Sequence, residues 1–374
     1  MVKNGQEIER RFWVRKLSDN FPKNAPVVDI IQGYFEPSAS GKPVRVRIAK
    51  TKKIFGESKK AYITLKSGKG KVREEKEHEI KPGLGKDLIK KCSHQLLKDR
   101  HLIDGWEVDF YKGPLAGVII AEKELKTADE VVNIPNWIAD ALEVTDSLTN
   151  YDLAKLAGEL NGSGLDPIPF IENHIRSSMP VIVLTGEPCS GKSSIIELVK
   201  KEMPEIHCVP EVAAIIIGQL GIKPGDNIIS NRRFQKAVYR VQRAFEEAAI
   251  QYAISQGKKA VLLDRGAPDG AAYFAGGLDE FESFLRAKRS SEYSRYHKVI
   301  CLSGAPKNIF EEKKTNNPVR SESYEEACAL GHRIRKAWEG HPHLIIIENG
   351  NGWTEKEASA RREIEKLISG KKSA

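Results

Sequence analysis

The chain has 374 residues, of which 40% are hydrophobic and 30% are charged, so its composition excludes a disordered chain and its length predicts two domains. Its 60 Lys and Arg residues outnumber 51 Asp and Glu residues, and the formal charge of +9 suits nucleic acid or a small polyanion as a partner. No apolar run reaches the roughly 18 residues that a membrane span needs, and no apolar signal region precedes Glu7, so we expect a cytoplasmic protein. The five cysteines lack metal-like spacing, which disfavours a zinc site and a disulfide framework.

The first 160 residues predict an antiparallel sheet. Apolar and charged residues alternate there with the period of two that is typical of strands. The expected strands are residues 7–14, 30–35, 44–48, 62–66, 73–80, 99–103, 106–111 and 118–125. An ordinary solvated face would explain any one of them. The repetition over eight strands favours a closed sheet with a charged interior, which is wide enough for such side chains and one small ligand.

The charged face carries both carboxylates and cationic side chains. Glu7, Glu9 and Arg11 share one side of the first expected strand, and Arg45 and Arg47 alternate with apolar residues in the third. Carboxylates hold hard divalent cations, and a cation together with basic side chains neutralises phosphate oxygens. This face therefore predicts a site for a metal-bound polyphosphate.

The segment Glu7-Ile8-Glu9-Arg10-Arg11 resembles the ExExK signature of the CYTH domain, the triphosphate tunnel metalloenzymes, with Arg11 in place of the family lysine. Further pieces agree with this family in order, and the match spans residues 1 to about 160. They are residues 32–35, 44–47, 64–66, 73–80, 98–100, 106–109, 121–125 and 143–145, followed by Tyr151.

This resemblance implies a tunnel of eight antiparallel strands that binds a triphosphate with Mg²⁺ or Mn²⁺. The positions that it marks as catalytic are Glu7, Glu9, Arg11 and Lys66. Those that it marks as metal-binding are Glu7, Glu9, Asp109, Glu122 and Glu124, with Glu75 and Glu77 as helpers. Those that it marks as triphosphate-binding are Arg45, Arg47, Lys66, Arg73, Lys98 and Arg100.

The pieces look most similar to the inorganic triphosphatase branch of the family, which favours tripolyphosphate as the substrate. The resemblance leaves two alternatives open: an adenylate cyclase of class IV type, and a sensor of phosphate chains or RNA 5′ ends whose tunnel does not turn over. Arg11 supports the sensor, because an arginine keeps the positive charge but does not carry a proton near neutral pH.

A linker separates this region from the rest of the chain. Asn161-Gly162-Ser163-Gly164 followed by Pro167 and Pro169 is typical of a connecting segment. We therefore expect a tunnel domain at residues 1–160, a linker at 161–177 and a second domain at 178–370.

The second domain predicts a P-loop. Gly186-Glu187-Pro188-Cys189-Ser190-Gly191-Lys192-Ser193-Ser194 contains GxxxxGK[ST], and it follows the apolar run 181–184 and precedes a helical stretch. Backbone amides of such a loop cradle the phosphates of ATP, while Lys192 reaches their β and γ oxygens and Ser193 holds Mg²⁺. Apolar runs at 181–184, 260–263, 299–302 and 344–347 alternate with helical stretches, which predicts an α/β domain around a parallel sheet.

Two carboxylates are candidates for the partner of the P-loop. Asp264 ends an apolar strand, as a metal-binding Walker B residue does, and Glu211 follows the short strand 206–209. Glu211 is equally well explained as a carboxylate at a helix N-terminus. The polar segment 313–320 resembles a lid that brings Arg320 to the ATP phosphates, although a solvated basic loop is an equal alternative. We expect the helix at 333–338 to form solvated surface.

The P-loop, Glu211, residues 232–246 and Asp264-Arg265-Gly266 with Asp269 resemble AAA-like P-loop ATPases and kinases related to ribosylnicotinamide kinase domains, over residues 178–370. The resemblance implies ATP binding and, if the domain is a kinase, an acceptor that the sequence does not identify. Because phosphate sites in both domains use the basic excess, nucleic acid is not favoured as a partner.

Overall fold

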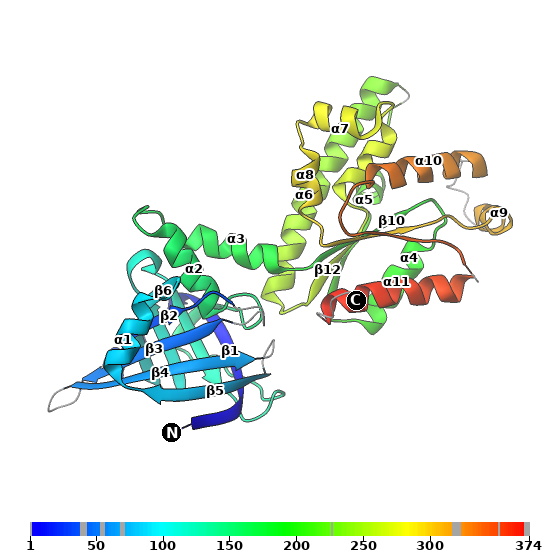
Figure 1. Ribbon diagram of the computed structural model, residues 1–374. Coiled ribbons are helices and arrows are strands. Elements are labelled where there is room, and N and C mark those ends of the chain that lie inside the picture. The colour runs from blue at the N-terminus through cyan, green and yellow to red at the C-terminus, as the bar shows by residue number, and fades with distance from the viewer. Residues whose placement is uncertain are drawn as a thin grey trace. The chain divides into compact units, whose positions relative to one another are not determined.

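The computed structural model describes residues 2–37, 43–52, 57–67, 72–225, 227–315, 323–350 and 352–369. For residues 2–6, 52, 66–67, 72–73 and 313–315 it describes the backbone only. The chain divides into two compact units, Met1–Ser178 and Met179–Ala374 (Figure 1).

Unit 1 contains a closed antiparallel sheet. The strands are β1 (Val2–Leu17), β2 (Val27–Tyr34), β3 (Val44–Lys52), β4 (Glu57–Ser67), β5 (Val72–Ile80), β6 (His94–Ile103), β7 (Trp106–Tyr111), β8 (Ile119–Glu124) and β9 (Ile138–Glu143). Their order is β5-β4-β3-β2-β6-β7-β8-β1-β9. The long strand β1 closes the sheet, because its first part pairs with β5 and its second part with β8.

All eight expected strands are present, whereas a ninth strand in the described part of unit 1 was not predicted. Strand β9 pairs with the second part of β1, which lies between β8 and β9. It therefore adds to the closed sheet of β1 to β8 without being needed for its closure. Its side chains do not alternate between buried and exposed, because only Ile138 is buried. Backbone pairing with β1 forms this strand, and a period-two pattern cannot reveal it.

The apolar side chains of the strands face outward and are covered from outside the sheet. Val46, Ile48 and Ala61 pack against Ile89 of α1 (Pro82–Lys90). A second cluster joins Phe12, Val14, Trp106, Val108 and Trp137. Because side chains alternate along each strand, the charged residues between these apolar positions point into the closed sheet.

Three further helical segments complete the described part of unit 1: η1 (Gly113–Leu115), α2 (Asn150–Leu160) and α3 (Ile168–Ser178). Helix α2 begins with a capping box in which Thr149 and Asp152 bond to each other's backbone N–H groups. This cap fixes the start of α2 and with it the position of Asn150. Helix α3 covers the second part of the segment, residues 161–177, that the sequence analysis treats as a linker, and it ends one residue beyond it.

Unit 2 is a parallel sheet with helices on both faces (Figure 1). Its strands, in the order β11-β12-β10-β13-β14, are β10 (Val181–Gly186), β11 (Ile206–Val209), β12 (Ala260–Asp264), β13 (Lys298–Leu302) and β14 (Leu344–Ile347). Its helices are α4 (Lys192–Glu202), α5 (Val212–Gly218), α6 (Ile228–Ser255), η2 (Ala267–Tyr273), α7 (Gly277–Leu285), α8 (Arg289–Tyr293), α9 (Lys307–Thr315), α10 (Tyr324–Ala337) and α11 (Trp353–Ile368). The sequence predicted this fold class and the strands correctly.

Two hydrophobic cores lie on the two faces of this sheet. Side chains from α6 and α10 pack against Val181, Val183 and Val261 on one face. Side chains from α4 and α11 pack against Ile182 and Leu184 on the other. All six residues of β10 are buried, so the loop that follows this strand starts from a rigid position.

The helix predicted as solvated surface at 333–338 is instead part of the core. Ile334 and Trp338 are completely buried, and both belong to the cluster beneath α10. Six residues are too short a window to show the apolar stripe of α10, which also includes Ala327 and Gly331. Within the described ranges, no helix is both long enough and apolar enough to cross a membrane.

Candidate functional site

Inside the closed sheet of unit 1, basic side chains of β3 pair with carboxylates of β5. The Nη2 atom of Arg45 lies 2.8 Å from Glu75 Oε1 and 3.1 Å from Thr64 Oγ1. The Nη2 atom of Arg47 donates to Glu77 Oε2 at 3.0 Å, and the hydroxyl of Thr64 donates to the same oxygen at 3.0 Å. The predicted phosphate-binding arginines and helper carboxylates are thus brought together across three neighbouring strands.

A second cluster joins β6, β7 and β8 and is more deeply buried. Lys98 Nζ lies 2.6 Å from Asp109 Oδ2, and Arg100 Nε lies 2.6 Å from Asp109 Oδ1. Arg100 also bonds Glu122 Oε2 at 2.8 Å and pairs with Glu107. Burial lowers the pKa of Lys98 to about 8 despite the attraction of Asp109. Burial alone would raise the pKa of Asp109, yet the charges of Arg100 and Lys98 outweigh it and lower that pKa.

Arg11 is held at the junction of β1, β8 and α2. Its Nη1 atom lies 2.6 Å from Glu122 Oε1, and its Nη2 atom donates to Asn150 Oδ1 at 3.0 Å. Tyr111 donates to the same Asn150 oxygen. Burial alone would lower the pKa of Arg11, but the negative charges of Glu122 and Glu9 raise it. Arg11 is therefore a permanent cation inside the sheet.

The sequence did not single out Tyr111 and Asn150 as members of this site. Tyr111 shares the face of Asp109 two residues earlier in β7, so the alternation of that strand contained the signal. Asn150 gave no such signal, because only the packing of α2 brings its side chain to Arg11.

Three guanidinium groups inside the sheet keep donors that nothing in the described residues satisfies. The buried Nε atoms of Arg11, Arg45 and Arg47 have no hydrogen-bond partner among these residues. An unsatisfied buried donor costs free energy, on the order of 1 to 3 kcal/mol, and an anionic oxygen would remove that cost. The interior is therefore suited to phosphate oxygens.

The oxygen donors of the predicted metal site also lie in the closed sheet. Glu9 of β1 is the register partner of Glu124 of β8, and Glu7 lies two residues before Glu9 on the same face. In the described ranges, no three Asp, Glu, His or Cys side chains converge closely enough to form a complete metal site. The donor set consists of carboxylates only, which fits a hard divalent cation that completes its shell with water and phosphate oxygens. The assignment of Asp109, Glu122, Glu75 and Glu77 to metal stays a prediction.

The side chains of Lys66 and Arg73 lie outside the described part of the structure. Their backbone register is described: Lys66 is opposite Glu75, and Arg73 is opposite Glu7. Their predicted roles in phosphate binding and catalysis stay predictions.

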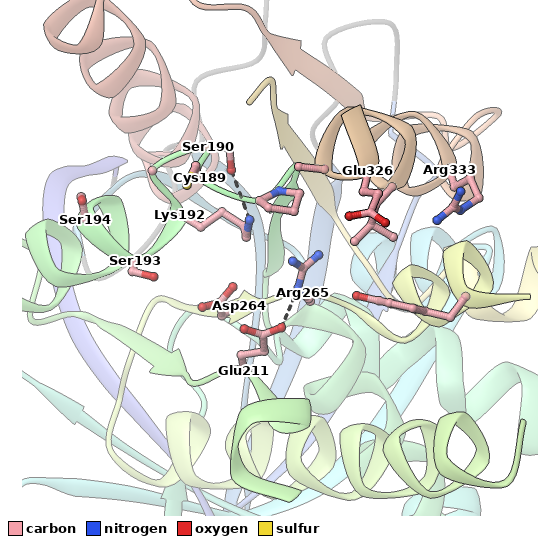
Figure 2. A pocket seen from close by; sticks show the side chains of 15 residues that line it. Cys189, Ser190, Lys192, Ser193, Ser194, Glu211, Asp264, Arg265, Glu326 and Arg333 are labelled. Carbon is pink, nitrogen blue, oxygen red and sulfur yellow. Dashed lines mark hydrogen bonds and ion pairs between the residues drawn. The ribbon is translucent and has the colours of Figure 1, made fainter. Parts of the chain in front are cut away.

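In unit 2 the P-loop connects β10 to α4. Gly186 has φ +131°, and a Cβ atom there would overlap the backbone of Leu302. Lys192 is folded back onto the loop, where its Nζ atom donates to Ser190 Oγ at 3.1 Å (Figure 2). The same atom donates to Glu187 O at 2.9 Å and to Gly186 O at 3.2 Å. Burial and the charge of Arg265 lower the pKa of Lys192 to about 8. The loop thus has the geometry of a phosphate cradle with its lysine in place.

A cavity of about 700 Å³ lies beside the P-loop (Figure 2). Its lining includes residues 188–194 of the loop, Glu211, Asp264 and Arg265. Burial and the charge of Glu211 raise the pKa of Asp264 to about 6, and its Oδ1 atom is buried without a hydrogen-bond partner among the described residues. A carboxylate oxygen in that state fits a divalent cation shared with Ser193.

Glu211 pairs with Arg265 instead of capping its helix. It occupies the N-cap position of α5, but its side chain makes no capping hydrogen bond there. Its Oε1 atom instead accepts from Arg265 Nε at 2.8 Å (Figure 2). Arg265 has φ +72°, a conformation that a non-glycine residue adopts at a cost in free energy.

Helix α10 and η2 supply cavity residues that the sequence did not predict. Tyr273, Glu326, Leu330 and Arg333 line the cavity, and Arg333 Nε donates to Ala272 O at 2.8 Å. Arg333 follows the predicted lid by only 13 residues, but no motif marks it. Of the predicted lid, residues 313–315 belong to helix α9 instead of a loop. Arg320 lies outside the described residues.

Comparisons with known proteins match each unit separately. Residues 181–356 match the family model of an AAA domain. The inorganic triphosphatase of Acetivibrio thermocellus is 32% identical over 160 residues, which cover 40% of this chain and 94% of that protein. The solved structure of the inorganic triphosphatase NE1496 aligns at 26% identity with a TM-score of 0.28, over 40% of this chain and 93% of that one. Another crystal structure, of the hypothetical protein NE1496, aligns with the same identity and TM-score over 96% of its length.

Proposed function

The chain belongs to the family of the inorganic triphosphatases through its N-terminal region, and we propose that its closed sheet hydrolyses a triphosphate, with inorganic tripolyphosphate as the favoured substrate. The observation that supports this most is the set of buried Nε donors of Arg11, Arg45 and Arg47. They lie in an interior that also holds Lys98 and Arg100. A small anion with many oxygens would accept hydrogen bonds from these three Nε donors at once, close to the positive charges of Lys98 and Arg100.

Mg²⁺ or Mn²⁺ is the metal of this proposal, held by Glu7, Glu9 and Glu124. A bound divalent cation activates a water molecule and neutralises charge on the phosphate oxygens. Arg45 and Arg47 bind the phosphate chain from β3, and Lys66 and Arg73 are expected to join them. Asp109 and Glu122 orient Lys98 and Arg100, because their oxygens already bond these cations at 2.6 to 2.8 Å.

For unit 2 the proposal is an ATP-binding domain of the ATPase or small-molecule kinase type. Lys192 leaves the loop carbonyls to bind the β and γ phosphates, while Ser193 and Asp264 hold Mg²⁺. If the domain is a kinase, Asp264 or Glu211 accepts the proton of the acceptor hydroxyl, and Arg265 orients the acceptor. The chemistry of that acceptor is not specified by these residues.

The test is phosphate release from tripolyphosphate, ATP and thiamine triphosphate with Mg²⁺ or Mn²⁺. Wild type is compared with the double variant Glu7→Gln, Glu9→Gln and with Lys192→Ala. We expect tripolyphosphate hydrolysis that only the glutamate variant abolishes. Slow ATP hydrolysis that depends on Lys192, with no tripolyphosphate hydrolysis, would refute the triphosphatase. Cyclic nucleotide and pyrophosphate formed from ATP would identify a cyclase instead.

The environment of Arg11 favours a second candidate, a tunnel that binds phosphate chains as a sensor without hydrolysing them. Arg11 stays charged, and Glu122 and Asn150 hold its guanidinium group, so it is not available to transfer protons. Tight tripolyphosphate binding without phosphate release would support this candidate. If the ligand is an RNA 5′ end, the affinity of the protein for RNA should also fall steeply as the salt concentration rises.

A further inference from the structure

One tryptophan of this chain differs from the other four in its exposure. Trp353, the first residue of α11, is 41% exposed, whereas Trp13, Trp106, Trp137 and Trp338 are at most 5% exposed. An indole is a large flat apolar ring, so an exposed one offers a face on which a ligand ring can stack.

The ring of Trp353 packs directly on the P-loop. Gly191 precedes Lys192, and a Cβ atom built at Gly191 would overlap the six-membered ring of Trp353. Gly191 also has φ +92°, so the position needs glycine for two reasons. The indole therefore lies beside the same loop residues that would cradle the phosphates of a nucleotide.

Buried hydrogen bonds fix the turn that carries Trp353. Lys356, which is 4% exposed, donates from Nζ to Asn349 Oδ1 at 3.0 Å and to the carbonyl oxygen of Ser303. Asn349 Nδ2 in turn donates to Gly304 O at 2.6 Å. These bonds connect the segments that follow β13 and β14, so the start of α11 is positioned before any ligand binds.

Trp353 lies on the side of the sheet where the base of a nucleotide bound to the P-loop is expected. Ligands of open parallel sheets bind outside the carboxyl ends of the strands, and Trp353 follows the carboxyl end of β14 at that edge. When the loop binds the phosphates of a nucleotide, the base lies next to the loop, and an exposed ring held in a fixed position there provides a surface for stacking. We propose that Trp353 is the platform on which the base of the bound nucleotide stacks, with a purine as the best-fitting ring. This inference rests on the proposed ATP binding by unit 2.

Tyr273 is the competing aromatic side chain, since it is 40% exposed and lines the cavity. Glu211, Asp264 and Glu326 line the same cavity, and these carboxylates suit a metal ion or an acceptor hydroxyl better than a neutral base. Trp353 is not among the residues that line this cavity, and its ring lies against Gly191 of the P-loop instead. The contact with the loop itself thus favours Trp353 over Tyr273.

The first experiment measures tryptophan fluorescence of the full chain during titration with Mg²⁺–ATP and with Mg²⁺–tripolyphosphate, which has three phosphates and no base. We expect ATP to quench the emission of Trp353 and tripolyphosphate to leave it unchanged. Trp353→Phe provides the background, because the four buried tryptophans remain in it. Equal responses of wild type and Trp353→Phe to ATP would overturn the proposal.

The second experiment measures the affinity for Mg²⁺–ATP by equilibrium dialysis with labelled ATP. Binding that remains in Lys192→Ala is subtracted, so that the affinity reported is that of the P-loop site. We expect Trp353→Ala to weaken it about tenfold and Trp353→Phe to restore it to within about threefold, because a phenyl ring still stacks. Tyr252→Ala is the control, since Tyr252 lies on α6, is 49% exposed, and contacts His207 instead of the loop. A loss of affinity in Tyr273→Ala but not in Trp353→Ala would assign the base to the cavity and overturn the proposal.

The two proposals fail in different ways. Wild-type protein without Lys192-dependent ATP binding would refute the nucleotide-binding function of unit 2. If wild type binds ATP in a Lys192-dependent way, but ATP does not quench its Trp353 emission and Trp353→Ala binds ATP as tightly as wild type, the stacking platform alone is refuted.

Discussion

The substitution Glu246→Gln tests whether a buried network positions the active-site turn of unit 2. Glu246, on α6, is 1% exposed and accepts hydrogen bonds from Gln242 Nε2 and Tyr296 OH, both at 3.0 Å. Gln242 also donates to the carbonyl of Arg265 at 3.2 Å, and Tyr296 accepts from Ala267 N at 3.0 Å. The network therefore holds the backbone on both sides of the strained turn that follows Asp264.

The expected loss of stability follows from the partners of Glu246. Arg295 pairs with this carboxylate, and its side chain is only 17% exposed. A glutamine keeps one accepting oxygen but removes the charge that Arg295 needs. A hydrogen bond to a charged group contributes about 1.5 to 3 kcal/mol, and the partial exposure of Arg295 allows water to replace part of it. We expect the free energy of unfolding to fall by about 2 to 3 kcal/mol, as measured by urea denaturation.

Glu292→Gln is the matched control on the same helix pair. Glu292 is 5% exposed and accepts from Arg243 at 2.9 and 3.0 Å and from Tyr239 at 2.8 Å. It therefore loses comparable interactions without touching the backbone of residues 265–267. We expect both variants to lose similar stability, but only Glu246→Gln to lose kcat of Lys192-dependent ATP turnover, by about tenfold with little change in KM. Equal kcat in the two variants would refute the positioning role.

Three further predictions concern the two phosphate sites. Gly191→Ala should abolish Lys192-dependent ATP binding, because a methyl group overlaps Trp353 and φ +92° disfavours alanine, and equilibrium dialysis measures it. The kcat/KM for tripolyphosphate should fall as the pH rises through about 8, because the pKa of Lys98 is lowered to about 8 and its ammonium group loses its proton there. In Lys98→Met this decrease at alkaline pH should be absent. Arg11→Lys should lower the free energy of unfolding, measured by urea denaturation, by about 1 to 3 kcal/mol, because a lysine cannot form the hydrogen bonds to Glu122 and Asn150 at the same time. The same variant should raise the rate of phosphate release from tripolyphosphate if proton transfer at this position limits turnover.

The sequence predicted those parts of the molecule that short-range patterns determine. Alternation with period two assigned Arg45, Arg47 and Asp109 to a common face, and the structure brings their strands together around one interior. The GxxxxGK[ST] spacing located Lys192 at the start of α4, because the loop geometry depends on residues that are adjacent in the chain.

The residues that the sequence missed reach their sites through packing between distant elements. Asn150 is 139 residues from Arg11, and Glu246 reaches the backbone of Arg265 through Gln242. Trp353 lies 162 positions beyond Gly191, and no sequence pattern around either residue predicts that they are in contact. Buried polar groups of this kind cost free energy unless every partner is in place, so their satisfaction is a property of the whole fold. A local motif can therefore identify the phosphate-binding atoms, whereas the groups that orient them become visible only once the chain is folded.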